Sequence, residues 1–296
     1  MIKIKTRYDP IAWVKPEVKE LKVLVTGDWH ALDKYGVNPP NIHSMEGTPI
    51  SQSDLQKKVF KETKKICEEI GHVDIAILMG DMAEGKQVKS QGVPLNDANT
   101  DTQVEAAFKF YEETIHKYNT PDVVVAVMGT PYHSSVGIGG NLDYQIALRI
   151  GTITNVIYGY PNLTMYVGAD KVKWSLRHKI SIAKVNRMMP LEQIVRLQAR
   201  DEAESFDGDL NNLPDISIFA HRHEPQIPVP IGQGRRWAAV SPPLKAADIY
   251  AETMQTPVKN TVGLMTITQY GLGDFRGSFK QINVEESTKK VDEITW

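Results

Sequence analysis

Three short, apolar and β-branched runs, each stopped by a glycine, most constrain how this chain can fold. They cover residues 22–26, 73–79 and 123–128, and they end at Gly27, Gly80 and Gly129. Runs of this length and composition predict buried strands. Between them, residues 54–70 and 104–118 space their apolar side chains at helical intervals. This strand, helix, strand, helix, strand order predicts a parallel sheet with right-handed crossovers.

Beyond residue 155 the pattern changes to short strand-like runs around one helical stretch near residues 191–205. The runs cover residues 164–167, 171–176, 216–220, 236–240 and 262–269. No linker rich in glycine, serine or proline separates the two halves. We therefore expect one α/β domain over residues 1–296, built as a two-sheet β-sandwich flanked by helices. Its core covers about residues 21–270, with a long polar insertion loop at about residues 82–100.

Composition and charge exclude several classes of protein. Hydrophobic residues make up 41% and charged residues 24% of the chain, which argues against a disordered protein, a collagen-like fibre or a coiled coil. A formal net charge of -2 gives no overall basic field for nucleic acid or anionic lipid. Cys67, the only cysteine, excludes an internal disulfide and a thiolate metal cluster. No apolar run reaches the roughly 18 residues of a membrane helix, and no signal peptide is visible, so we expect a cytoplasmic protein without a membrane partner.

Candidate metal ligands and acids follow each of the three predicted strands. Asp28 and His30 come after the first, Asp81 after the second, and Thr130 and His133 after the third. Because parallel strands end at one edge of a sheet, these side chains should converge there. In an extended segment, residues two apart point the same way, so Asp28 and His30 can hold one ion.

Three further histidines lie in the second half of the chain. His221 and His223 repeat the spacing of two after residues 216–220, and His178 ends another strand-like run. Carboxylates and imidazoles without thiolates suit divalent manganese, iron, zinc or nickel better than calcium. Two such ions ~3.5 to 4 Å apart would clamp a phosphate and generate a hydroxide nucleophile near neutral pH.

In order and spacing, these residues resemble the calcineurin-like metallophosphoesterase family across about residues 23–243. The family signature is a D-x-H, a G-D-x-x-D-G, a G-N-H-D/E, a later lone histidine and a G-H-x-H. The resemblance implies a four-layer αββα fold and two divalent metal ions, with manganese favoured and iron, zinc or nickel as alternatives. It implies that one metal is bound by Asp28, His30, Asp81 and His223, and the other by Asp81, His178 and His221.

Three positions depart from that signature. Ala220 replaces the glycine of the last block, and Glu84 stands where aspartate is usual, at a position that supports the ligands without binding the metal. The third block reads G-T-x-x-H, so Thr130 occupies the place of the asparagine ligand. The Thr130 hydroxyl, a water molecule or the Asn141 amide could replace that ligand, and the sequence leaves all three open. His133 is the candidate for protonating the leaving oxygen, a role worth ~10² to 10⁴ in rate.

These inferences predict a metal-dependent phosphoesterase with a binuclear centre. Its partner would be a phosphate-ester substrate, and a phosphodiester of nucleic acid or a nucleotide is favoured over a phosphomonoester or a phosphoprotein. The alternative from another class is a catalytically inactive scaffold of the same fold, which uses the altered third block to bind a partner. The six matched ligand positions favour the enzyme. The motifs carry no information on oligomeric state.

Overall fold

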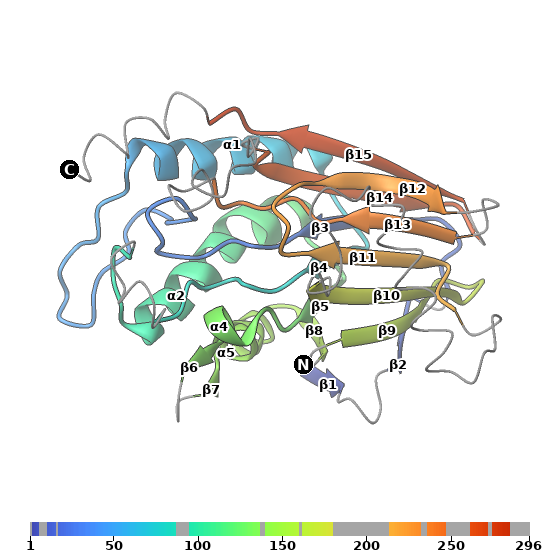
Figure 1. Ribbon diagram of the computed structural model, residues 1–296, viewed down its shortest axis with the longest axis horizontal. Helices are drawn as coiled ribbons and strands as arrows, with labels where there is room; N and C mark the ends of the chain where they lie inside the picture. Colours follow the sequence, from blue (N-terminus) through green and yellow to red (C-terminus); the bar gives the residue numbers. More distant parts are fainter. Residues whose placement is uncertain are drawn as a thin grey trace, which may run out of the picture.

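The computed structural model places two β-sheets face to face, with helices packed on the larger sheet (Figure 1). It describes residues 2–5, 11–15, 17–86, 95–136, 140–159, 162–179, 213–231, 236–246, 261–271 and 274–284. The helix expected near residues 191–205 therefore lies outside the described residues, as does the 87–94 part of the expected insertion loop. No helix of the described part of the chain is long and apolar enough to cross a membrane.

Seven strands form the larger sheet. In chain order they are β1 (Ile2–Lys5), β3 (Leu21–Thr26), β4 (Ile75–Leu78), β5 (Val123–Val127), β8 (Asn155–Gly159), β14 (Gly263–Gln269) and β15 (Phe275–Gln281). Their order across the sheet is β1-β8-β5-β4-β3-β14-β15. The strands β3, β4, β5 and β8 pair in parallel, whereas β14 is antiparallel to both of its neighbours. The three strands predicted from the glycine-terminated runs therefore end at one edge, as expected.

Six strands form the smaller sheet. They are β2 (Ile11–Val14), β9 (Asn162–Val167), β10 (Val172–Lys179), β11 (Ile216–Ala220), β12 (Gln226–Ile231) and β13 (Arg236–Val240), in the order β12-β13-β11-β10-β9-β2. Its central strands β10, β11 and β13 are parallel to one another. A separate short hairpin pairs β6 (Ser135–Val136) with β7 (Gly140–Asn141). The ends of β10 and β11 thus also lie on a common side.

Helices cover the outer face of the larger sheet. They are α1 (Asp54–Ile70), α2 (Thr100–Tyr111), a π-helix η1 (Glu112–His116), α3 (Lys117–Asn119), α4 (Pro131–Ser134) and α5 (Leu142–Ile150). The first helix has the bounds that its apolar spacing predicts. It starts with a capping box between Ser53 and Gln56, and Gly71 ends it with a φ of 65°.

The central strands of the larger sheet are covered on both faces, which explains why their sequences are apolar throughout. Leu24, Ala76 and Val124 pack against the helices, whereas Val23 and Ile75 pack against the smaller sheet. Strands buried on both faces read as continuous hydrophobic runs. The two-sheet α/β prediction is therefore confirmed. Within the described residues helices cover only the larger sheet, so three of the four expected layers are present there.

Candidate metal centre

The ends of β3 and β4 bring Asp28, His30 and Asp81 together. Hydrogen bonds continue the pairing of these strands beyond their last residues, because the N–H of Asp28 donates to the carbonyl of Gly80 at 2.9 Å and that of His30 to the carbonyl of Asp81 at 3.0 Å. All three candidate ligands are buried. The loops that carry them are therefore fixed by the sheet itself.

Five of the six predicted ligands adopt a left-handed backbone conformation. Their φ angles are 48° at Asp28, 45° at His30, 51° at Asp81, 69° at His221 and 56° at His223. Such conformations are uncommon for residues other than glycine, cost of order 1–3 kcal/mol each and cluster at functional sites. The expected extended geometry of the first motif is therefore wrong, and its two side chains converge because the chain turns at each ligand.

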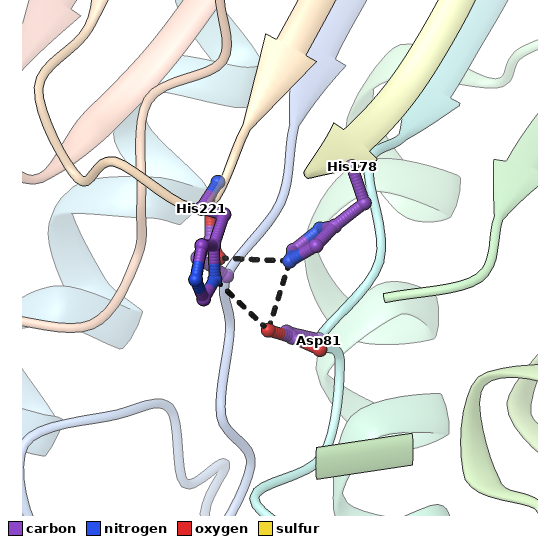
Figure 2. Close-up of side chains that lie close together, drawn as sticks. Asp81, His178 and His221 are labelled. Atoms are coloured by element: carbon purple, nitrogen blue, oxygen red, sulfur yellow. Dashed lines mark hydrogen bonds and ion pairs between the residues drawn. The ribbon is translucent and has the colours of Figure 1, made fainter. Parts of the chain in front are cut away.

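The smaller sheet supplies the three other predicted ligands. His178 lies near the end of β10, and His221 follows β11 (Figure 2). His223 comes two residues after His221. Nε2 of His178 lies 2.9 Å from Oδ2 of Asp81, and Nδ1 of His221 lies 3.8 Å from the same oxygen. Nε2 of His223 lies 3.5 Å from Oδ1 of Asp28. Residues nearly 200 positions apart thus meet between the two sheets.

The candidate ligand atoms form three overlapping clusters, in each of which they lie within 4.8 Å of one another. One cluster consists of Asp28, His30 and His223, the second of Asp28, Asp81, His178 and His221, and the third of His30, Asp81 and His133. All six predicted ligands are included. Asp28 and Asp81 are each shared by two of these clusters, and the resemblance implies Asp81 as the carboxylate common to both metals. Asp81 Oδ1 accepts the Thr130 N–H at 2.7 Å, so that Oδ2 is the oxygen close to His178 and His221.

Three buried atoms at the centre have no hydrogen-bond partner among the described residues. They are Oδ1 of Asp28, Nε2 of His30, which lies 3.9 Å from that oxygen, and Nε2 of His178. Leaving a buried polar atom unpaired costs ~1–3 kcal/mol, so such atoms need an explanation. An acceptor oxygen beside an imidazole nitrogen can hold a divalent cation, which would satisfy both atoms.

Charge coupling within the centre shifts several pKa values. Burial alone would raise the pKa of Asp81, but His178 and His221 hold it well below its usual range. Burial opposes protonation of His178, yet Asp81 and Asp28 together raise the pKa of this histidine to about 10. Burial, together with the positive charge of Lys245, lowers the pKa of His30 well below its ordinary value. In the absence of metal, His178 therefore carries a proton that a cation would displace.

Glu84 supports His30, as the resemblance implies for this position. Its Oε2 lies 2.5 Å from Nδ1 of His30, which leaves Nε2 as the nitrogen for a ligand. The Lys245 ammonium lies 3.5 Å from the same carboxylate oxygen and 3.3 Å from Oδ2 of Asp33. Glutamate, which is longer than the aspartate usual at this position, therefore still contacts Nδ1 of His30.

The structure gives Thr130 and Asn141 different positions. The Thr130 hydroxyl lies 3.2 Å from both carboxylate oxygens of Asp81, so this residue contacts the centre through a predicted ligand. Asn141 is the N-cap of α5, where its amide oxygen accepts the Tyr144 N–H at 3.2 Å. This hydrogen bond caps the helix. It uses the amide oxygen, which is the atom that a replacement ligand would offer to a metal.

His133 belongs to the third cluster, together with His30 and Asp81. Its Nδ1 is 3.0 Å from the main-chain carbonyl of Glu84, and its ring packs edge-on against that of His30 with 4.6 Å between the ring centroids. Donation of the Nδ1 proton to the carbonyl fixes the tautomer and leaves Nε2 for other partners. Burial lowers the pKa of His133.

Asp143 supports the loops of the candidate centre, a role that the sequence did not predict. Its buried carboxylate accepts three main-chain N–H groups, from Asp81 at 3.3 Å, Met82 at 2.9 Å and Gly129 at 2.8 Å. It therefore joins the loops after β4 and β5. Burial and the neighbouring Asp81 raise its pKa to about 6. In the sequence an aspartate in the first helical turn signals only helix capping, so no pattern points to this role.

Comparison with known proteins leaves the family open. No protein-family model and no curated protein matches the chain. Among solved structures, it is similar to a conserved uncharacterised protein and predicted phosphoesterase from Streptococcus pneumoniae TIGR4, with 11% identity and a TM-score of 0.37 over 88% of this chain and 90% of that one. It is also similar to Vacuolar Protein Sorting 29 from Cryptosporidium parvum, with 11% identity and a TM-score of 0.40 over 88% and 97%. At these TM-scores the likeness assigns neither a family nor an activity, so function is argued from the residues of the site.

Proposed function

We propose that this chain is a metal-dependent phosphoesterase that hydrolyses a phosphate ester at two divalent cations. The observation that carries the proposal is the pair of overlapping clusters around Asp28, in which Asp28 Oδ1 and His30 Nε2 are buried without hydrogen-bond partners among the described residues. Unpaired acceptor atoms at a carboxylate and imidazole centre fit divalent cations, and we propose manganese as the first choice, before iron, zinc or nickel.

Each predicted ligand then has a stated place. Asp28, His30, Asp81 and His223 would hold one cation, and Asp81, His178 and His221 would hold the second, with Asp28 close to both sets. When bound, such cations supply positive charge to phosphate oxygens and lower the pKa of water. The protein excludes bulk water by burying both aspartates and orients His30 through Glu84.

His133 would deliver the proton to the leaving oxygen. In its protonated form Nδ1–H donates to the Glu84 carbonyl, and Nε2–H is the donor that the leaving alcohol requires. The ring lies against His30, so this proton would be held next to the cation cluster. Thr130 would act by keeping the Asp81 carboxylate turned toward His178.

Among phosphate esters, we favour a phosphodiester of nucleic acid or a nucleotide as the substrate. The preference follows from the sequence, in which a long polar segment comes directly after Asp81 and leaves room for a chain-like substrate. Phosphomonoesters and phosphoproteins are the competing substrates. The altered third block, in which Thr130 binds a carboxylate, supports an inactive scaffold as the second candidate function.

A substrate panel tests both candidates. The metal-free protein is loaded with Mn²⁺ and given single-stranded DNA, duplex DNA, RNA, cyclic nucleotides and phosphomonoesters. We expect Mn²⁺-dependent hydrolysis of phosphodiesters that Asp81→Asn abolishes and that the exposed control Asp54→Asn preserves. If the loaded protein never exceeds the Asp81→Asn variant on any substrate, the scaffold function replaces the enzyme.

A further inference from the structure

A buried lysine lies behind the candidate metal centre. Only 8% of the Lys245 side chain is exposed, and its ammonium lies between two fully buried carboxylates, 3.3 Å from Oδ2 of Asp33 and 3.5 Å from Oε2 of Glu84. Buried lysines are rare unless they are paired. An ammonium offers three donors, so it can serve both carboxylates at once.

The main chain around this lysine is anchored independently of the ammonium. The N–H groups of Leu244 and Lys245 donate to the carbonyl of Asp28 at 3.2 Å and 3.0 Å, and that of Ala246 donates to the carbonyl of Tyr35 at 2.9 Å. These bonds place the segment after β13 against the loop that carries the first predicted ligands. A substitution of the Lys245 side chain leaves all three bonds available.

Glu84 connects the lysine to both functional histidines. The oxygen that faces Lys245 also lies 2.5 Å from Nδ1 of His30 and 3.7 Å from Nδ1 of His133. The main-chain carbonyl of the same residue is the hydrogen-bond partner of His133. A rotation of the Glu84 side chain would therefore disturb His30 directly and would alter the surroundings of His133.

We propose that Lys245 is a positioning residue of this centre: its ammonium fixes the Glu84 carboxylate in the orientation that holds His30 ready to bind a metal. The inference rests on the proposed function. Without the ammonium, Asp33 and Glu84 would be buried carboxylates that have lost the cation between them, and burial of uncompensated charge is strongly unfavourable. Glu84 would then turn away from its present position, and its hold on His30 would weaken.

The test compares Lys245→Met with wild type and with Lys280→Met, a matched control in which an exposed ion pair to Glu69 is removed. Calorimetry measures Mn²⁺ affinity, and ¹⁵N NMR of the metal-free protein reports the ring nitrogens of His30. We expect the Lys245→Met variant to bind Mn²⁺ about 10- to 100-fold more weakly. Its His30 signals should shift and its kcat should fall with little change in KM. Lys280→Met should match wild type in every measurement, and Lys245→Arg should restore most of the affinity.

A double variant shows whether Lys245 acts through Glu84. If it does, Lys245→Met combined with Glu84→Gln binds Mn²⁺ no more weakly than Glu84→Gln alone, because the two substitutions break one connection. Thermal melting verifies that each variant is folded. Lys245→Gln, which is neutral but keeps hydrogen-bond donors, replaces Lys245→Met if the latter does not fold, and the same loss is expected.

The outcomes separate this inference from the proposed function. Normal Mn²⁺ affinity and unchanged His30 signals in a folded Lys245 variant overturn the positioning role alone, as does full additivity with Glu84→Gln. Failure of the wild-type protein to bind Mn²⁺ overturns the proposed function and the positioning role with it.

Discussion

At the scale of single residues, the neighbours of His133 fix which of its ring nitrogens can act on a substrate. Its Nδ1 faces a main-chain carbonyl, which can only accept a hydrogen bond. This contact holds whichever protonation state the ring adopts, so only Nε2 can exchange a proton with a substrate. We therefore separate proton transfer, which we assign to His133, from metal binding, which we assign to the other histidines, although the His133 ring also lies close to His30 and Asp81.

His133→Ala tests that separation. We expect Mn²⁺ affinity close to wild type and a kcat lowered ~10²- to 10⁴-fold on esters of alkyl alcohols. The loss should be much smaller on a p-nitrophenyl ester, because p-nitrophenolate departs without a proton. Steady-state kinetics on the two ester classes give the comparison, with the exposed His43→Ala as control. An equal loss on both would contradict the proton-donor role.

The His178–Asp81 pair makes the metal-free protein sensitive to alkaline pH. The pKa of His178 is raised from 6.5 to about 10 in the folded state by Asp81 and Asp28. The ion pair therefore contributes stability that is fully present below pH 6.5 and is lost as the pH rises toward and through 10. Urea unfolding with EDTA present should show a falling free energy of unfolding between pH 7 and 10.

His178→Gln provides the control for that pH dependence. The glutamine side chain does not titrate, so the decline between pH 7 and 10 should flatten in this variant. Calorimetry in buffers of different ionisation enthalpy should also show that wild-type protein releases a proton when Mn²⁺ binds at pH 8, since the cation displaces the proton of His178. Binding without proton release would show that His178 is not protonated in the metal-free protein at pH 8.

At the scale of secondary-structure elements, the main chains of the loops after β4 and β5 are in close contact. A Cβ atom on Gly80 would lie 2.4 Å from the main-chain nitrogen of Gly129, and one on Gly129 would lie 2.0 Å from Oδ1 of Asp81. Only glycine fits such a contact. The glycines that stop the apolar runs thus also allow the two loops to meet, and Asp143 at the start of α5 binds both of them.

Asp143→Asn should loosen this junction. The amide supplies one acceptor oxygen in place of two and turns a donor toward main-chain N–H groups, so at least one of these groups loses its partner. We expect the free energy of unfolding in urea to fall by about 1–3 kcal/mol, and Mn²⁺ affinity to fall with it because Asp81 is displaced. The exposed Asp54→Asn serves as control. Stability and metal affinity unchanged from wild type would show that the three hydrogen bonds are dispensable.

The strands and the residues directly after them were predictable, because local pattern determines both. The runs before Gly80 and Gly129 specify β4 and β5, and parallel ends bring their ligands to one edge. Edge strands such as β1 and β15 were not recognised, since pairing with distant partners and not local apolarity defines them. The roles of Lys245 and Asp143 were not predicted for the same reason. Each residue acts through contacts made by tertiary packing, and neither lies in a recognisable motif.

At the scale of the whole molecule, the candidate centre joins the two sheets. Asp28, His30 and Asp81 follow strands of the larger sheet, whereas His178, His221 and His223 belong to the smaller one. Apart from this centre, the interface between the sheets is mainly apolar, with Val25, Ile77 and Trp174 at its core. A buried hydrogen bond from Nε1 of Trp174 to Oε1 of Gln269 also crosses it at 2.8 Å. Cations bound to ligands from both sides would connect the sheets through bonds that the unfolded chain cannot form.

Metal binding should therefore stabilise the whole fold and slow its global opening. At a free Mn²⁺ concentration 100 times Kd, one site contributes about 2.7 kcal/mol. Cys67 provides an independent readout, because its thiol lies fully buried on α1 and burial raises its pKa to about 12, so a thiol reagent reaches it only when the fold opens. We expect Mn²⁺ to raise Tm and to slow labelling of Cys67 in wild type, and to do neither in Asp81→Asn. If the rate of Cys67 labelling is the same with and without bound Mn²⁺, the cations are bound by one sheet and leave the contact between the sheets unchanged.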